Sequence, residues 1–156
     1  MTVNVETPAI SGTGLEYGFF APVSVYLDDL DFMGMLHNSR FTVLGERAFA
    51  AYWRDNGVFV SKDWELLGDS FMVVKEQRVS YEFPVKAGEY GVHGWVERIG
   101  RTSMTCGFRL CSADGTLTHA HGSRTNVRLD RQTLRPCEWS DEARRVNEKL
   151  LRPATG

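Results

Sequence analysis

One stretch of this chain carries apolar residues at the spacing of a helix, and the four apolar runs that follow it alternate as strands do. Between residues 38 and 57, Phe41, Leu44 and Ala48 recur every three or four positions, which places them on one helical face. Phe49 lies off that face, so the helix is expected to be covered on more than one side. The rest of the chain must therefore wrap one helix, and this requirement limits the fold more than any other feature.

The other apolar runs are rich in β-branched and aromatic residues, which favour strands. One run precedes the helix at residues 22–28, and the later four occupy 71–84, 90–99, 102–112 and 117–130. Short turn signals separate the later runs, and the Asp114-Gly115 pair is typical of a hairpin. A strand, a helix and four strands joined by short turns predict an α+β fold, in which an antiparallel sheet of five to six strands curls around one long central helix.

Both ends of the predicted helix carry cap signals. Asn38 or Ser39 suits the N-cap, because either side chain can accept a hydrogen bond from an N–H group of the first turn. Asn56 and Gly57 tolerate left-handed backbone and therefore provide a stop. These limits predict roughly seventeen helical residues and a length of about 25 Å.

The length of the chain bounds its organisation, because 156 residues suffice for one packed domain and are too few for two. We expect a loose leader at residues 1–15, a folded domain at 16–139, and a tail at 140–156 that opens with a short helix capped by Ser140. The formal net charge of −2 does not indicate a nucleic-acid partner. The three cysteines form no CxxC pair, which argues against a disulfide framework or a structural zinc site and favours a reducing compartment.

No segment of the sequence indicates secretion or a membrane. The N-terminal residues lack the basic and apolar regions of a secretory signal. No apolar run reaches the ~20 residues that span a bilayer. We therefore expect a cytoplasmic protein with no membrane partner.

The segment before the predicted helix concentrates negative charge, and it reads DDLDFMGMLHNSRF at residues 28–41. Asp29, Asp31 and Gly34 stand in an Asp-x-Asp-x-x-Gly pattern. This segment and the order of elements around it resemble the hot-dog fold thioesterases, in the branch of 4-hydroxybenzoyl-CoA thioesterase and its acyl-CoA thioesterase relatives. The resemblance extends over most of the chain, from about residue 20 to about residue 140.

This resemblance implies hydrolysis of an acyl-CoA or acyl-carrier-protein thioester by a homodimer or homotetramer, with no metal or other cofactor. It maps the catalytic carboxylate to Asp31 and the amide that polarises the thioester carbonyl to about Asn38. Many relatives carry a histidine directly after the glycine of the motif. This chain has Met35 at that place and its histidine at His37.

The chemistry of thioester hydrolysis gives an independent reason for such an arrangement. The reaction needs a carboxylate that attacks the carbonyl or activates water, and donors for the developing oxyanion. A helix N-terminus offers unpaired N–H groups and a partial positive charge. Asp31 beside the amides of Asn38 and Ser39 would supply both requirements. The alternative, that Asp29 and Asp31 only brace the turn, stays open on the sequence alone.

Five further residues are candidates for the site. Glu46 is a second candidate carboxylate, because none of its helical neighbours can neutralise it; alternatively it bonds across a subunit interface or to a loop backbone. His37 could orient substrate or water, or satisfy local backbone groups. We expect Gly34 and Ser39 to contact the substrate. Arg128 and other late arginines could meet the phosphates of coenzyme A or form a solvated rim.

Two other functions and the nature of the acyl group stay open. The fold also suits a non-catalytic acyl-thioester binding or regulatory module, and a hydratase or dehydratase that pairs a carboxylate with a histidine. A metal site is not expected, because His119 and His121 share a strand face without a nearby third ligand. Aromatic residues that could line an aryl or a fatty pocket, or belong to the core, are Phe32, Phe41, Trp64 and Phe71.

Overall fold

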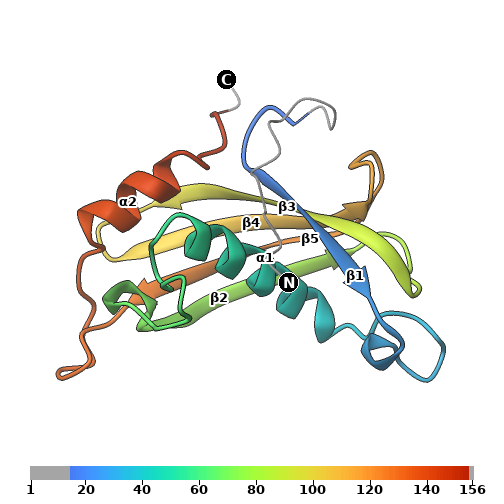
Figure 1. Cartoon of the computed structure of the whole chain (residues 1–156), viewed down its shortest axis with the longest axis horizontal. Coiled ribbons are helices and arrows are strands. Elements are labelled where there is room, and N and C mark those ends of the chain that lie inside the picture. The colour runs from blue at the N-terminus through green and yellow to red at the C-terminus, as the bar shows by residue number, and fades with distance from the viewer. Residues whose placement is uncertain (1–14, 155–156) are drawn as a thin grey trace.

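The computed structural model describes residues 15–154, which form one antiparallel sheet with a helix packed against it (Figure 1). The elements are β1 (Phe19–Val25), η1 (Leu27–Asp29), α1 (Arg40–Asp55), η2 (Gly68–Ser70), β2 (Met72–Tyr81), β3 (Gly88–Ile99), β4 (Ser103–Ser112), β5 (Thr118–Arg128) and α2 (Asp141–Glu148). The five strands of the described residues lie in the order β1-β3-β4-β5-β2. The predicted α+β fold, with one helix against an antiparallel sheet, is therefore confirmed. The central helix is short rather than long, with 16 residues.

The position of β2 differs from the one expected for strands joined in sequence by short turns. β3, β4 and β5 pair as successive hairpin strands, but β2 pairs with β5 at one edge and β3 pairs with β1 near the other. Residues 82–87 therefore cross from one side of the sheet to the other instead of forming a hairpin. The proline-containing turn signal at these residues marks a break in the strand, but it carries no information on which strands pair.

The first strand ends earlier than the alternating residues 22–28 predicted, because β1 stops at Val25 and a single 3-10 turn follows it. Asp29 causes this turn. One of its carboxylate oxygens accepts a hydrogen bond from the Tyr26 N–H at 2.9 Å, and the Asp29 N–H donates to the Tyr26 carbonyl at 3.1 Å. A side chain that bonds back to the third residue before it bends the chain away from the sheet.

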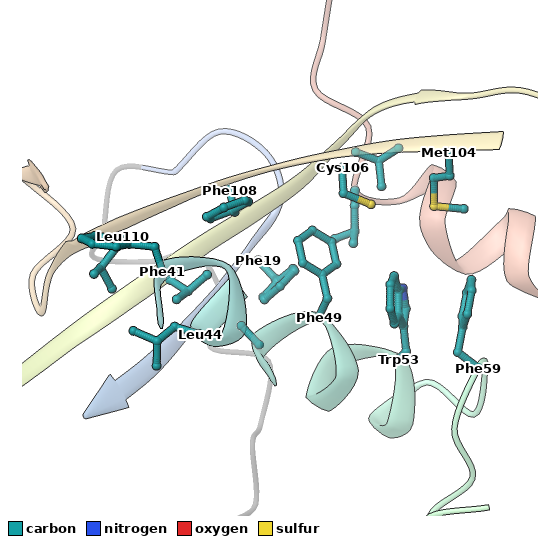
Figure 2. Packing of buried hydrophobic residues seen from close by; sticks show 14 of the residues in the cluster. Phe19, Phe41, Leu44, Phe49, Trp53, Phe59, Met104, Cys106, Phe108 and Leu110 are labelled. Atoms are coloured by element: carbon teal, nitrogen blue, oxygen red, sulfur yellow. The ribbon is translucent and has the colours of Figure 1, made fainter. Parts of the chain in front are cut away.

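The core lies between α1 and the sheet (Figure 2). Phe49 and Trp53 extend from α1 toward β4, where Cys106 and Phe108 face them. Burial raises the pKa of the Cys106 thiol to about 12, so this side chain packs as a small apolar group. Phe59, from the loop after α1, stacks on Trp53 with the ring centres 4.3 Å apart. The helix is thus covered both by the sheet and by the loop that follows it.

The closing helix α2 is fixed to the same core. The Ser140 hydroxyl accepts a hydrogen bond from the Ala143 N–H at 3.1 Å, which confirms the predicted N-cap. The buried Asn147 side chain accepts a bond from the Trp53 indole N–H at 2.8 Å. The predicted leader lies outside the described residues except for Leu15, and the domain boundaries stay predictions. None of the described helices combines the length and the apolar character needed to cross a membrane.

Candidate active site

The loop before α1 is folded around the carboxylate of Asp31. Its Oδ1 atom accepts hydrogen bonds from the Met33 N–H at 2.8 Å and the Met35 N–H at 3.1 Å. The Asp31 N–H donates to the Met35 carbonyl at 2.7 Å, which closes the loop. Gly34 has φ of 77°, a left-handed conformation that explains the glycine at this place of the motif. No described residue donates to Oδ2 of Asp31, so one carboxylate oxygen stays available.

The start of α1 is capped by His37 and not by the predicted Asn38 or Ser39 side chain. Neither Asn38 nor Ser39 accepts a cap hydrogen bond through its side chain. Instead His37 Nδ1 accepts the Ser39 N–H at 3.1 Å and lies 2.8 Å from the Ser39 hydroxyl. An Nδ1 atom that accepts a backbone N–H carries no proton, so the ring proton of a neutral His37 is on its other nitrogen, Nε2. The histidine therefore takes the capping role expected of its neighbours.

The backbone amide of Asn38 is an open donor at this helix end. The Asn38 N–H donates to no other described residue. On its other side, the Asn38 carbonyl accepts a hydrogen bond from the Tyr81 hydroxyl at 3.2 Å. Tyr81 also packs edge-on against Phe41 with the ring centres 4.8 Å apart. Tyr81, at the end of β2, thus holds the turn before α1 in place, and the Asn38 N–H stays without a hydrogen-bond partner among the described residues.

These groups share one cleft of about 510 Å³ between the motif loop, the start of α1 and the end of β2. Asp31, His37 and Asn38 all line it, together with Phe41 and Tyr81. Three of the predicted catalytic residues are therefore brought together. The two expected substrate contacts in this loop, at positions 34 and 39, flank the cleft without lining it. A carboxylate and a free helix N-terminal amide in one cleft can act on opposite sides of a carbonyl carbon.

Asp29 has a different environment from Asp31, although only one residue separates them. It is 6% exposed, its carboxylate bonds to the Tyr26 N–H, and the Arg40 guanidinium lies 3.7 Å away. The proposal that aspartates of this motif brace the turn therefore describes Asp29 well. Asp31 also braces its loop, but its Oδ2 atom accepts no hydrogen bond from a described residue, and Asp31 lines the cleft.

Glu46 lies in a second, separate cavity of about 240 Å³ between α1 and the sheet. Its carboxylate forms an ion pair with Arg124 of β5. The sequence argument considered only the neighbours of Glu46 on the helix, and the partner comes from the sheet instead. The cavity walls are mostly apolar, and Phe49 and Phe108 are among them.

Sequence reasoning missed most of this cavity. Of the aromatic residues named in advance, Phe32 and Phe41 line the cleft, whereas Trp64 and Phe71 line neither pocket. The cavity instead uses Phe49, Trp53, Phe59, Phe108 and the polar Asn126. Strand alternation could have placed positions 106 and 108, and positions 124 and 126, on one sheet face. Which face meets the helix depends on the strand order, which the sequence does not give.

Arg128 is placed apart from the cleft. It lies at the last position of β5, opposite Met72, whereas the cleft borders the Tyr81 end, where β5 has Ala120. These two β5 positions are eight residues apart along the strand, a span of ~27 Å. The Arg128 guanidinium bonds inside the protein, with the buried Asp69 carboxylate at 3.3 Å and the Glu138 carbonyl. Its engagement with these groups does not support a contact with substrate phosphates.

The two late histidines also have local partners. His119 lies 3.2 Å from the Pro84 carbonyl, and His121 lies 3.1 Å from the Glu82 carboxylate. Among residues 15–154, no three metal-binding side chains converge.

Comparison with known proteins places this fold among thioesterases. A model of the Thioesterase-like superfamily matches residues 25–146. A thioesterase from Thermus thermophilus, solved in complex with coenzyme A and zinc, is 26% identical, with 86% of this chain and 96% of that chain covered and a TM-score of 0.69. No curated protein matches the sequence.

Two structures of lower sequence identity share the fold. A Pseudomonas aeruginosa protein is 22% identical, with 89% of this chain and 95% of that chain covered and a TM-score of 0.76. A 1,4-dihydroxy-2-naphthoyl-CoA thioesterase from Synechocystis is 13% identical, with 86% and 98% covered and a TM-score of 0.73. The hot-dog fold expected from the sequence is therefore confirmed.

Proposed function

Because this chain belongs to the Thioesterase-like superfamily, we propose that it hydrolyses the thioester of an acyl-CoA or acyl-carrier-protein substrate. The observation that carries this proposal is the cleft in which Asp31 and the free Asn38 amide lie together. The complex of the Thermus thermophilus relative with coenzyme A supports a coenzyme A ester as the substrate.

Asp31 supplies the reactive carboxylate in this proposal. Its Oδ1 atom is fixed by two backbone N–H groups, so Oδ2 is oriented without a competing cation. Two routes use this oxygen. It attacks the carbonyl carbon, and water then hydrolyses the resulting anhydride, or it removes a proton from a water molecule that attacks instead. In both routes the carbon–sulfur bond breaks, and the thiolate takes a proton as it leaves.

The Asn38 amide stabilises the oxyanion that develops on the thioester carbonyl. It lies at the N-terminus of α1, where the helix dipole adds a partial positive charge. His37 acts as a positioning residue, because its Nδ1 holds the adjacent Ser39 N–H and so fixes the turn that presents Asn38. Gly34 contributes through its backbone, since its left-handed φ lets the loop close around Asp31.

Substitution of Asp31 tests this proposal directly. Asp31→Asn keeps an oxygen that can accept the two loop hydrogen bonds but removes the negative charge. We expect kcat for release of free thiol from a panel of acyl-CoA esters to fall by about 10²–10⁴ in this variant. Undiminished turnover in both Asp31→Asn and Asp31→Ala would transfer the role to another carboxylate.

Asp114 provides a matched control. It occupies the β4–β5 hairpin, where its Oδ1 accepts the Thr116 N–H at 3.0 Å, and so it braces a turn as Asp31 does. It lines none of the pockets that contain the candidate residues. Asp114→Asn is expected to leave turnover unchanged within about twofold. If Asp114→Asn lowered turnover as much as Asp31→Asn does, the loss in both variants would come from a less stable fold and not from a catalytic role of Asp31.

A hydratase is the second candidate function, because His37 and Asp31 line the same cleft. Such an enzyme adds water to a carbon–carbon double bond with a carboxylate and a histidine as acid and base. An assay of enoyl-CoA hydration on the wild-type protein separates the two candidates. Hydration without thiol release would favour the hydratase.

We also infer that the protein acts as a homodimer or homotetramer. β2 is an edge strand, and the side chains of Val73 and Val74 on it are each 48% exposed. Exposed apolar edge strands pair readily with another chain. Light scattering coupled to size exclusion should give at least twice the mass of one chain, and a stable monomer at micromolar concentration would contradict this inference.

A further inference from the structure

We propose that the face of the sheet opposite α1 carries a second binding site, which holds the phosphate group of a small phosphate monoester other than the thioester substrate. The site is a pocket of about 460 Å³, which we call the outer pocket. Its walls come from β2, β3, β4 and β5 and from Arg152, which follows α2. This inference goes beyond the proposed hydrolysis, because the cleft and the outer pocket share no lining residue.

Strand alternation places the outer pocket on the face of the sheet that α1 does not cover. Phe108 of β4 belongs to the core between α1 and the sheet (Figure 2). Successive side chains of a strand point to opposite faces, so the neighbouring Gly107 and Arg109 belong to the other face. β2 shows the same separation at its end. Tyr81 packs on Phe41 of α1 and lines the cleft, whereas the adjacent Ser80 lines the outer pocket.

The strand pairings bring the polar groups of this face together from four strands. Residues paired directly across neighbouring strands have Cβ atoms about 4.5–5.5 Å apart. Two adjacent rows of paired residues cross the sheet here, His93, Arg109, His121 and Ser80 in one row and Trp95, Gly107, Ser123 and Arg78 in the next. Arginine and hydroxyl groups that are far apart in sequence are therefore within reach of one small ligand.

Arg109 brings a positive charge to the outer pocket that no described carboxylate neutralises. Its Nε–H donates to His93 Nδ1 at 3.0 Å, its Nη1 to the Thr118 hydroxyl at 2.9 Å and its Nη2 to the Gly115 carbonyl at 2.8 Å. Burial lowers the pKa of His93, which keeps this partner neutral as well. The ion pairs of the described residues do not include Arg109.

The same three bonds fix the guanidinium of Arg109 and leave part of it available. A guanidinium has five N–H donors, so Nη1 and Nη2 each keep one hydrogen that these bonds do not use. An arginine held in place by neutral acceptors loses little conformational freedom when it binds an anion. Arg109 is therefore oriented for an anion and keeps its full charge for it.

The other charged groups of the outer pocket stand in pairs near its rim. Arg78 lies 2.6 Å from Glu76, and its side chain is 79% exposed. Arg152 lies 2.8 Å from Glu97, the only carboxylate that lines the pocket in the described part of the chain. Exposed ion pairs contribute little stability, so Arg78 can turn toward an anion at small cost. Positive charge thus predominates among the lining residues.

The chemistry of these donors favours a phosphate group. A phosphate monoester presents three oxygens that accept several hydrogen bonds at once, and an arginine fork suits this arrangement. The hydroxyls of Ser80 and Ser123 add neutral donors to the same pocket. A carboxylate offers one oxygen fewer. The volume exceeds that of a phosphate alone, so the organic part of the ester has room beside Trp95, which lines the pocket.

Calorimetric titration of the full-length wild type tests the class of ligand. The probes are inorganic phosphate, phenyl phosphate and benzoate, added in a phosphate-free buffer of low ionic strength, because salt screens exposed charges. We expect phenyl phosphate to bind at least about tenfold more tightly than benzoate. Equal affinities, or no binding of phenyl phosphate up to about 10 mM, would overturn the proposal.

Substitution of the two arginines tests which groups hold the phosphate. Arg109→Gln should raise Kd for phenyl phosphate at least about tenfold, and Arg78→Gln about threefold, since Arg78 is the more exposed. Arg101→Gln is a matched control for Arg78→Gln, because Arg101 is 75% exposed, pairs with Glu138 at 3.1 Å and lies outside the outer pocket. A loss in Arg101→Gln equal to that in Arg78→Gln would mean that binding follows net charge alone, and the site would be rejected.

Nuclear magnetic resonance locates the ligand on the wild type, so this test does not require that Arg109→Gln folds. Titration with phenyl phosphate should shift the amide signals of Gly107, Gly122 and Ser123 in a saturable way. The amide signals of Met33 and Asn38, beside the cleft, should stay unchanged. Saturable shifts at Met33 and Asn38 without shifts on β4 and β5 would place the anion at the helix N-terminus and overturn the proposal.

A kinetic measurement separates this site from the substrate site. Saturating phenyl phosphate should leave KM for an acyl-CoA ester unchanged within about twofold, because the cleft and the outer pocket can be filled together. Competition with the acyl-CoA ester would overturn the proposal of a second site. If the protein releases no thiol from any ester, the proposed hydrolysis fails, whereas calorimetry and magnetic resonance still decide whether the outer pocket binds phosphate.

Discussion

The two pockets along α1 each contain a candidate catalytic carboxylate, and the surroundings of the two candidates differ. In the cleft, Asp31 is held only by neutral N–H groups of its own loop. In the cavity, Glu46 is paired with the guanidinium of Arg124 from the sheet. The cleft is built from loops and element ends, whereas the cavity is enclosed by a helix, three strands and a loop.

This difference indicates that the two carboxylates have different roles. A carboxylate held by neutral dipoles keeps its full charge for attack on a carbonyl or on water. A carboxylate in an ion pair must first break that pair, which disfavours it as a base or nucleophile. The surroundings of Asp31 therefore suit the proposed reaction better than those of Glu46 do. Each prediction below tests one part of this comparison between the two pockets.

The largest expected effect separates the two carboxylates by activity. Asp31→Asn should reduce kcat by about 10²–10⁴, whereas Glu46→Gln should reduce it by less than about tenfold, because Gln keeps the size of Glu46 and a hydrogen bond to Arg124. The measurement is thiol release from acyl-CoA under single-turnover conditions, which isolates the chemical step. A larger loss in Glu46→Gln than in Asp31→Asn would reverse the assignment of the two pockets.

The second effect separates the two aspartates of the motif by stability. Asp29→Ala should lower the free energy of unfolding by about 2–3 kcal/mol, because it leaves the Tyr26 N–H and the nearby Arg40 without their buried partner. Asp31→Ala should cost about 1 kcal/mol, since its two loop amides can bond to water instead. Urea denaturation followed by fluorescence measures both values. Equal losses would show that the two carboxylates share one structural role.

The sequence predicted those features of the fold that depend on residues close along the chain. The helical spacing of Phe41, Leu44 and Ala48 gave the position of α1, and alternation gave the strands. The glycine of the Asp-x-Asp-x-x-Gly motif and the Ser140 cap are likewise local. Strand order was not predictable in this way, because the turn before β3 does not determine which strand β3 meets.

The same distinction between near and distant residues applies to the site. The grouping of Asp31 with Asn38 follows from a loop and a helix end that are adjacent in sequence. The ion pair between Glu46 and Arg124, and the contact of Arg128 with Asp69, join residues that are far apart in sequence. Such contacts appear only when the sheet is assembled against the helix. His37 satisfies a local backbone N–H, which was one of the two roles considered for it, but it does so in place of the expected Asn38 or Ser39 cap, which a ring nitrogen rarely replaces.

The third prediction concerns the apolar character of the cavity. Burial raises the pKa of Cys106 to about 12, above its ordinary value of 9.0, so the folded protein keeps this proton where the unfolded chain loses it. The stability that this buried, protonated thiol contributes is complete below pH 9 and is lost as the pH rises toward 12. Between pH 8 and pH 10, the wild type should therefore lose about 1 kcal/mol more stability than Cys106→Ala. If the wild type and Cys106→Ala lost the same stability over this pH range, the folded protein would accommodate the charged thiolate at the cavity wall.

The smallest effect is expected at Tyr81, which joins the end of β2 to the turn that presents Asn38. Tyr81→Phe removes the hydroxyl that donates to the Asn38 carbonyl but keeps the ring that packs on Phe41. Because the Asn38 N–H itself is untouched, kcat should fall only about three- to tenfold, with a change in stability below about 1 kcal/mol. Tyr81→Leu, which also removes the ring contact, should additionally raise KM. If Tyr81→Phe instead lowered kcat as much as Asp31→Asn, the hydroxyl itself would contact the substrate, and the cleft would contain a donor beyond the helix end.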